Sequence, residues 1–152
     1  MNFQTPPSIC QHMASMLPIR SKLVLEPTPG DGNLVKALID AGLRVHAPDD
    51  FWTVDDKYDA IVMNPPFSPM QLGYKILSRC MEMSDVVVAL MPWLTIINSE
   101  KRTRQIMDFG LRSVTHLPRN AFKGSRVQTC ILEMNRWWKG STLFSAYKGK
   151  NE

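Results

Sequence analysis

Four consecutive residues, Asn64-Pro65-Pro66-Phe67, have the composition of a rigid site that accepts the hydrogens of an amine. Two successive prolines fix the backbone and remove two N–H donors, which leaves carbonyl groups without a local partner. The Asn64 side-chain oxygen and the Pro65 carbonyl can then receive both hydrogens of an –NH2 group, while Phe67 offers a face on which a flat base stacks. The alternative is a rigid strand terminator, with Phe67 packed into the core.

A second candidate site is the turn Pro27 to Gly32, which follows a short apolar strand ending at Glu26. A strand, a glycine turn and a helix in succession can hold a nucleotide-like ligand against backbone N–H groups. The dinucleotide fingerprint is incomplete, because Val35 stands where its third glycine belongs, and the chain has no Gly-Lys-Ser/Thr motif. The turn therefore suits a ligand that has no phosphates and carries a positive amine. The alternative is a plain strand-to-helix connection in which Asp31 is the helix N-cap.

The elements that would position these turns alternate between short apolar runs and amphipathic stretches. This pattern predicts an α/β fold with a mostly parallel central sheet and helices on both faces. We expect strands at 21–26, 43–47, 58–63, 86–91, 113–117 and 128–134. We expect helices at 8–17, from 34 to a stop at Gly42, from Pro69 with Ser68 as its N-cap, and at 99–109.

Length and composition favour one globular domain. The chain has 152 residues, of which 44% are hydrophobic and 21% charged, and we expect a domain at 1–147 with a flexible basic tail at 148–152. No apolar run approaches the ~20 residues of a membrane span, and the N-terminus does not resemble a signal peptide, so we expect a cytoplasmic protein with no membrane partner. The three cysteines form no C-x-x-C pair, so neither a disulfide framework nor a metal site is expected. The net charge of +4 is weak support for a polyanionic partner.

The two turns, taken together, resemble motifs of the adenine-N6 class of DNA amino-methyltransferases. Thr5-Pro6-Pro7 resembles that family's upstream Thr-Pro-Pro segment, and the stretch from Leu25 to Leu34 resembles its Glu-Pro-x-x-Gly-x-Gly motif. Asn64-Pro65-Pro66-Phe67 resembles its catalytic (Asp/Asn/Ser)-Pro-Pro-(Tyr/Phe/Trp) motif. A softer match, from Leu117 to Leu132, resembles the late loop and strand in which an aromatic residue, here Phe122, helps to hold a flipped base.

The resemblance implies a Rossmann-like fold that binds S-adenosylmethionine and transfers its methyl group to N6 of adenine. The catalytic residues would be Asn64, Pro65, Pro66 and Phe67. The cofactor-binding residues would be Thr5, Pro6, Pro7, Glu26, Pro27, Thr28, Gly30, Gly32, Asn33, Leu34, Asp49, Asp50 and Phe51. The substrate-binding residues would be Phe122, Arg119, Lys123 and Arg126, and the exposed part of the 99–109 helix (Lys101, Arg102, Arg104) either contacts phosphates as well or is an ordinary solvated surface.

The sequence departs from the family's pattern in two places. Between Gly32 and Asn64 it holds one strand where two strands and a helix are usual, so the fold is shortened. As a result, either Asp49 or Asp50 could contact the ribose, and Asp50-Phe51 could instead lie beside the cofactor's adenine. The chain also shows no target-recognition domain, which implies a separate specificity subunit, a homo-oligomer or low specificity.

Other substrates and roles stay open at this point. The nucleic acid is expected to be DNA rather than RNA, although Asn-Pro-Pro-Phe also occurs in RNA adenine-N6 enzymes. A protein-glutamine N5 methyltransferase would present the same –NH2 group to the site. A non-catalytic subunit that only binds S-adenosylmethionine is the alternative from a different functional class.

Overall fold

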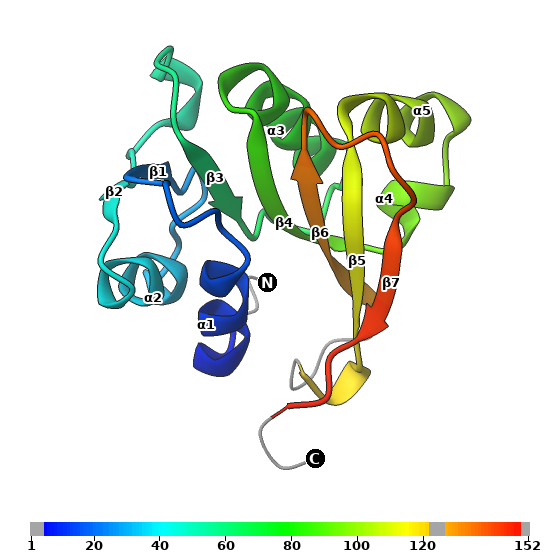
Figure 1. Cartoon of the computed structure of the whole chain (residues 1–152), viewed down its shortest axis with the longest axis horizontal. Coiled ribbons are helices and arrows are strands. Elements are labelled where there is room, and N and C mark those ends of the chain that lie inside the picture. Colours follow the sequence, from blue (N-terminus) through cyan, green and yellow to red (C-terminus); the bar gives the residue numbers. More distant parts are fainter. Residues whose placement is uncertain (1–4, 122–126, 150–152) are drawn as a thin grey trace.

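The computed structural model describes residues 5–121 and 127–149, which form a mixed α/β fold around one sheet (Figure 1). In this part of the chain the sheet has seven strands in the order β2-β1-β3-β4-β6-β5-β7. The strands are β1 (Leu23–Leu25), β2 (Arg44–His46), β3 (Ala60–Met63), β4 (Val86–Pro92), β5 (Leu111–Leu117), β6 (Thr129–Asn135) and β7 (Leu143–Ala146). The helices are α1 (Pro7–Ser15), α2 (Asn33–Asp40), α3 (Met70–Met83), α4 (Leu94–Ile97) and α5 (Glu100–Phe109), with 3-10 turns η1 (Phe51–Thr53) and η2 (Arg119–Ala121).

The sheet is mostly parallel, as the sequence predicts. Strands β2, β1, β3 and β4 are parallel to one another, and β7 is parallel to β5. Only β6 runs antiparallel to its neighbours, β4 and β5. This arrangement places the carboxyl ends of β1 and β3 side by side at one edge of the sheet, which is where parallel α/β sheets bind ligands.

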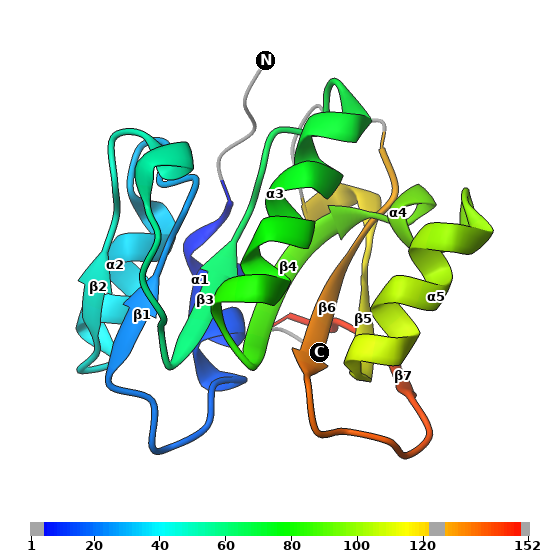
Figure 2. The same ribbon diagram turned by 90° about the horizontal axis from the view of Figure 1, so that it is seen from above.

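Helices cover both faces of the sheet because its central strands are apolar on both sides (Figures 1 and 2). On one face, α1 and α2 pack against Val24, Val62 and Leu90. On the other face, α3 and α5 pack against the alternate strand residues, among them Ile61 and Ala89. The prediction of a Rossmann-like α/β fold with helices on both faces is therefore confirmed.

The predicted start of the helix at Pro69 is wrong, and the structure excludes the alternative in which Asp31 is an N-cap. Helix α3 begins at Met70, not Pro69, because Pro69 has extended backbone angles (φ −71°, ψ 148°) and stands at the N-cap position without a side-chain cap. Ser68 precedes it and is therefore not the cap. Helix α2 has Gly32 at its N-cap, with φ 91°, so Asp31 does not cap it. A left-handed backbone at this position suits glycine, which has no Cβ to clash with the chain.

Four elements of the described residues were not predicted, namely strand β7, helix α4 and the 3-10 turns η1 and η2. Strand β7 forms the sheet edge beside β5, and all four of its residues are exposed, so it lacks the buried alternation that marks a strand in sequence. Helix α4 is a single turn between β4 and α5. Between α2 and β3 the chain forms only β2 and η1, in agreement with the single strand expected there.

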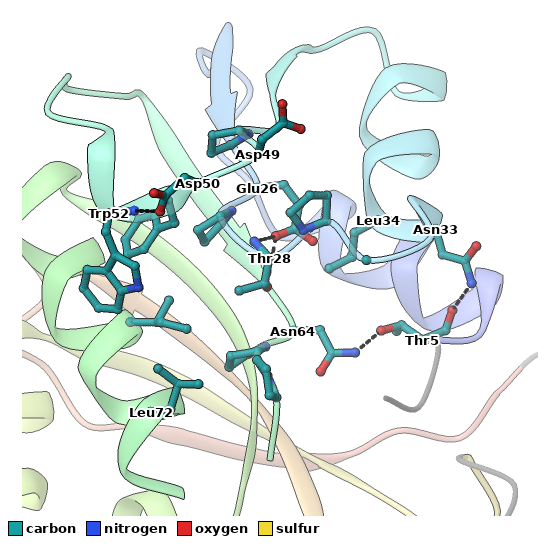
Figure 3. Close-up of a pocket in the computed structure, with 18 of the residues that line it drawn as sticks. Thr5, Glu26, Thr28, Asn33, Leu34, Asp49, Asp50, Trp52, Asn64 and Leu72 are labelled. Carbon is teal, nitrogen blue, oxygen red and sulfur yellow. Dashed lines mark hydrogen bonds between the residues drawn. The ribbon is translucent and has the colours of Figure 1, made fainter. Parts of the chain in front are cut away.

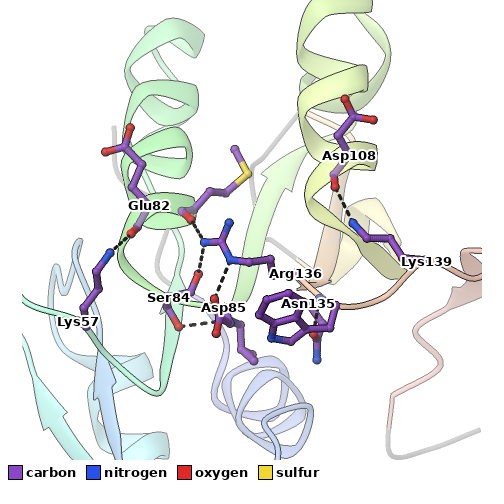
Figure 4. Close-up of polar contacts among 11 residues, drawn as sticks. Lys57, Glu82, Ser84, Asp85, Asp108, Asn135, Arg136 and Lys139 are labelled. Atoms are coloured by element: carbon purple, nitrogen blue, oxygen red, sulfur yellow. Dashed lines mark hydrogen bonds and ion pairs between the residues drawn. The ribbon is translucent and has the colours of Figure 1, made fainter.

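A polar cluster lies at the end of the sheet where β4 begins and β6 ends, opposite the carboxyl ends of β1 and β3 (Figure 4). Arg136 follows β6 and pairs with Asp85, which precedes β4, at 2.6 Å. The same guanidinium donates to the carbonyls of Met81 and Ser84 at the end of α3. These bonds tie α3, β4 and β6 together at a distance from the two candidate turns.

No helix in residues 5–121 and 127–149 is both long enough and apolar enough to cross a membrane.

Candidate active site

The two candidate turns line a single pocket at the carboxyl ends of β1 and β3 (Figure 3). Its volume is about 510 Å3, within the usual range for small-molecule sites. All of its lining residues fall between positions 5 and 76: Thr5, Glu26, Pro27, Thr28, Pro29, Gly30, Asn33, Leu34, Pro48, Asp49, Asp50, Phe51, Trp52, Asn64, Pro65, Pro66, Phe67, Leu72 and Ile76. Residues from the first turn and from the second therefore face the same space.

Glu26 is the buried carboxyl of this pocket, with only 1% of its surface exposed. It directly follows β1, and one of its oxygens accepts hydrogen bonds from the Thr28 backbone N–H at 2.6 Å and the Thr28 hydroxyl at 3.2 Å. Burial raises the Glu26 pKa to about 7, although the two bonds from Thr28 oppose that rise. A cationic group in the pocket would favour the ionised carboxylate, since it would replace the solvation that burial removes.

Asn64 is held at the end of β3 by a residue from the N-terminal segment. Its side-chain nitrogen donates to the hydroxyl of Thr5, and its amide oxygen is turned away from Thr5 (Figure 3). The carbonyl of Thr5 accepts a bond of 3.0 Å from the Asn33 side chain, at the start of α2. Thr5 thus contacts Asn33, which directly follows the glycine turn, and Asn64 of the Asn-Pro-Pro-Phe turn.

Helix α3 supports the proline turn from one side. Pro65 is buried, and Pro66 and Phe67 are half-buried. Gly73 of α3 lies so close to the turn that a Cβ at this position would be 3.1 Å from the Pro66 carbonyl oxygen and 3.7 Å from the Pro65 ring. Phe67 both lines the pocket and packs against the core on the α1 and α2 side, so the two readings of this residue are compatible.

The segment between β2 and β3 forms the remaining wall of the pocket. Asp50 caps η1, because its carboxylate accepts a bond of 3.0 Å from the Trp52 backbone N–H. Phe51 is buried, and the exposed Asp49 lines the pocket; its carboxylate forms no hydrogen bond or ion pair with the described residues. In Figure 3 the Asp49 carboxylate points away from Glu26, whereas Asp50 lies beside Trp52.

Sequence reasoning missed several lining residues, notably Trp52, Leu72 and Ile76. Trp52 is 56% exposed although it lines the pocket. The signal for Trp52 was its position directly after Asp50-Phe51. The signal for Leu72 and Ile76 was their four-residue spacing on the helix that follows the proline turn. Pro29 and Pro48 were missed as well.

Other expected site residues lie elsewhere. Pro6 is the N-cap of α1, Pro7 is its first residue, and Gly32 is the N-cap of α2; none of the three is among the lining residues. Arg119 lies in η2, also outside the pocket. Three expected substrate contacts, Phe122, Lys123 and Arg126, fall outside the described residues.

The basic residues of α5 engage in local contacts. Arg104 pairs with Glu100 at 2.8 Å, and both side chains are mostly exposed. Arg102 lies 4.6 Å above the Tyr74 ring of α3. The three histidines each have an aromatic ring beside them, namely Tyr147 for His12, Tyr58 for His46 and Trp93 for His116, and none lines the pocket.

Comparison with solved structures identifies the fold. A protein described as a class I S-adenosylmethionine-dependent methyltransferase of Listeria monocytogenes has a TM-score of 0.75 and 16% identity, over 98% of this chain and 67% of that one. The modification subunit of a type I restriction enzyme from Vibrio vulnificus YJ016 has a TM-score of 0.73 and 17% identity, over 99% and 48%. The 23S rRNA methyltransferase ErmE has a TM-score of 0.65 and 18% identity, over 89% and 70%.

At these identities the similarity is one of fold alone. The shared fold is the Rossmann-like fold of S-adenosylmethionine-dependent methyltransferases. The chain spans about half the length of the type I modification subunit that it matches. No protein-family model matches the sequence, and a comparison with curated protein sequences finds no match.

Proposed function

We propose that this protein transfers a methyl group from S-adenosylmethionine to the exocyclic N6 amine of adenine in DNA. The observation that carries the proposal is the shared pocket, in which Gly30 of the glycine turn and Asn64 of the proline turn line the same space. A methyl donor on the first turn and an amine on the second would then meet within one cavity. Proximity of this kind is a large part of catalysis by two-substrate enzymes.

The residues present fit S-adenosylmethionine. Glu26 is a buried carboxyl that a cation would stabilise, and the cofactor's ammonium group is a cation. Gly30, which lines the pocket, has a left-handed backbone with φ of 52°, a conformation that a residue with a Cβ rarely adopts. Asp49, Asp50 and Phe51 would take the adenosine part, alongside Trp52. When bound, the cofactor supplies a methyl group on a sulfonium, which is a good leaving group.

The protein's own contribution to the reaction is the acceptance of two hydrogen bonds. An adenine amine is a poor nucleophile because its lone pair is delocalised into the ring. If the Asn64 side-chain oxygen and the Pro65 carbonyl accept its two N–H hydrogens, the nitrogen becomes more pyramidal and its lone pair is freed. With the cofactor bound, the freed lone pair would attack the methyl carbon as the carbon–sulfur bond breaks, and the surplus proton of the nitrogen would leave to water. The two hydrogen bonds strengthen as positive charge develops on nitrogen, so they favour the transition state.

Charge and phosphate-binding residues support a nucleic acid as the substrate, and the fold likeness to type I modification subunits favours DNA. The net charge of +4 favours a polyanion. Arg119, with Lys123 and Arg126 further along the same connection, would contact phosphates, and Phe122 would hold the extruded base. The fold likeness to type I modification subunits, of which the chain spans about half, favours a separate polypeptide as the source of sequence specificity. The likeness to a 23S rRNA methyltransferase makes RNA the second candidate.

Transfer of label from S-adenosylmethionine to separate pools of DNA, RNA and protein tests the proposal. We expect incorporation into N6-methyladenine in the DNA pool, and incorporation into RNA or into protein glutamine alone would replace DNA as the substrate. Asn64→Ala should lower transfer at least about 100-fold, while the affinity for S-adenosylhomocysteine changes less than about threefold. Asn135→Ala, at the opposite edge of the sheet, is the matched control. Cofactor binding without transfer to any pool would identify a non-catalytic binding subunit instead.

A further inference from the structure

We infer that Thr5 is a positioning residue, which holds the Asn64 amide so that its oxygen is free to accept the substrate's amine. The inference rests on the proposed function and adds to it a residue that acts through Asn64 and not through the cofactor. Its basis is the bond from the Asn64 side-chain nitrogen to the Thr5 hydroxyl, which joins residues 59 positions apart in the chain.

Thr5 is itself firmly held. Only 3% of its surface is exposed, although it lies close to the chain's N-terminus. Its carbonyl accepts from the Asn33 side chain at 3.0 Å and from the Cys10 thiol at 3.5 Å. The residue after it, Pro6, caps α1, whose Ile9, Cys10 and Met13 are buried in the core. The hydroxyl is therefore presented to Asn64 from a backbone with little freedom to move.

The chemistry of an amide makes this contact matter. An asparagine side chain has one acceptor and two N–H donors, and only the acceptor can receive a hydrogen from an amine. When the Asn64 oxygen faces the amine, its nitrogen needs an acceptor elsewhere, because leaving an N–H of this half-buried side chain unpaired costs up to about 1–3 kcal/mol. The Thr5 hydroxyl is that acceptor. Without the Thr5 hydroxyl, the Asn64 amide could adopt several orientations, and only some of them would turn its oxygen toward the substrate's amine.

The same contact connects the two turns of the site. Asn33 begins α2 directly after the glycine turn, and it bonds to the Thr5 backbone, while Asn64 bonds to the Thr5 side chain. The first and second turns are thus linked through one residue. A shift of Thr5 would change the distance between them, and misplacement by about 1 Å can cost roughly 100-fold in rate.

Thr5→Val and Thr5→Ser test the inference in the full chain. Valine keeps the shape but removes the hydroxyl, so we expect kcat to fall about 10- to 100-fold, with the Kd for S-adenosylhomocysteine changed less than about threefold. Serine keeps the hydroxyl and should restore kcat to within about threefold of wild type. Thr95→Val is the matched control, because the Thr95 hydroxyl is buried without a hydrogen-bond partner in the described part of the chain; its kcat should be that of wild type.

A measurement that does not depend on turnover accompanies these rates. In 15N-labelled protein, the Asn64 side-chain amide protons should exchange slowly with solvent, and exchange should accelerate in Thr5→Val but not in Thr5→Ser. Wild-type kcat in Thr5→Val would overturn the inference, and so would a loss of cofactor affinity with kcat unchanged, which would make Thr5 a cofactor contact only. Equal loss in the valine and serine variants would assign the effect to packing. Failure of the proposed function is distinct, since wild-type protein would then transfer no label, or would transfer it only to RNA or protein.

Discussion

Glu26 is the residue through which pH should act on this protein. Its pKa rises from an ordinary 4.5 to about 7, chiefly because burial disfavours the charged form. When folding raises the pKa of a carboxyl, the neutral form of that carboxyl stabilises the folded state relative to the ionised form. The contribution of Glu26 to the free energy of unfolding is therefore highest below pH 4.5 and falls as the pH rises to 7, after which no further change comes from this group. The total is about 3 kcal/mol, at roughly 1.4 kcal/mol for each tenfold change in the acidity constant.

Binding of a ligand that carries an ammonium group should reverse this preference, because the ammonium needs the ionised carboxylate as its partner. With a pKa of about 7, about one tenth of Glu26 is ionised at pH 6 and about nine tenths at pH 8. At pH 8 about half of the ligand's own amine, whose pKa is about 8, is neutral. The Kd for S-adenosylhomocysteine should therefore be about fivefold lower at pH 8 than at pH 6, with about one proton released on binding at pH 6. Calorimetry in buffers of different ionisation enthalpy measures both quantities.

Glu26→Gln separates this effect from titration of the ligand's own amine, whose pKa lies near ~8. Glutamine can still accept hydrogen bonds from Thr28 but cannot ionise. The variant should therefore bind S-adenosylhomocysteine with a higher Kd than wild type at pH 8, and that Kd should be nearly independent of pH between 6 and 8. The ligand-free variant should also be more stable than wild type at pH 8, by up to about 3 kcal/mol in chemical denaturation. Glu133→Gln is the matched control, since Glu133 is half-buried, bonds to Ser113 at 2.7 Å and lies outside the pocket. An affinity that does not change between pH 6 and pH 8 in wild type, or the same slope in Glu26→Gln, would refute the reasoning.

Two further substitutions test the walls of the pocket. Gly73→Ala should push the Pro66 carbonyl by a few tenths of an ångström and lower kcat several-fold, while the Kd for S-adenosylhomocysteine stays constant. Unchanged kcat in steady-state assays would show that the turn tolerates the shift. Trp52→Ala should weaken S-adenosylhomocysteine binding about tenfold, because stacking on an aromatic ring contributes roughly 1–3 kcal/mol. Calorimetry compares it with Trp137→Ala, whose side chain is 73% exposed and lies outside the pocket; equal affinities in the two variants would exclude a contact with Trp52.

The parts of the fold that the sequence predicts are those with a strong apolar pattern. Strand β3 is buried at every residue, and β4 at all but its first, so their apolar runs are unmistakable. Strand β7 carries no such signal, because exposed edge residues are not constrained to be apolar. The start of α3 was misplaced by one residue, since Pro69 suits both the first helical position and the extended backbone that it has here.

The candidate site divides in a similar way. Its two turns could be found from residue types alone, because proline pairs and glycine turns have few uses at the ends of buried strands. The bond between Thr5 and Asn64 could not, since it joins segments 59 residues apart whose proximity depends on the packing of α1. Nor could the close approach of Gly73 to Pro66, which depends on the angle at which α3 leaves the turn.

Among the described residues, those that line the pocket all lie between positions 5 and 76, and this has a consequence for how the molecule can change. The strands from β4 onward support the pocket through the core but contribute no side chain to its lining. Mutations on the outer surface of that second half can accumulate without contact with the donor site. A new acceptor preference can therefore arise there while the chemistry of the first half is inherited intact.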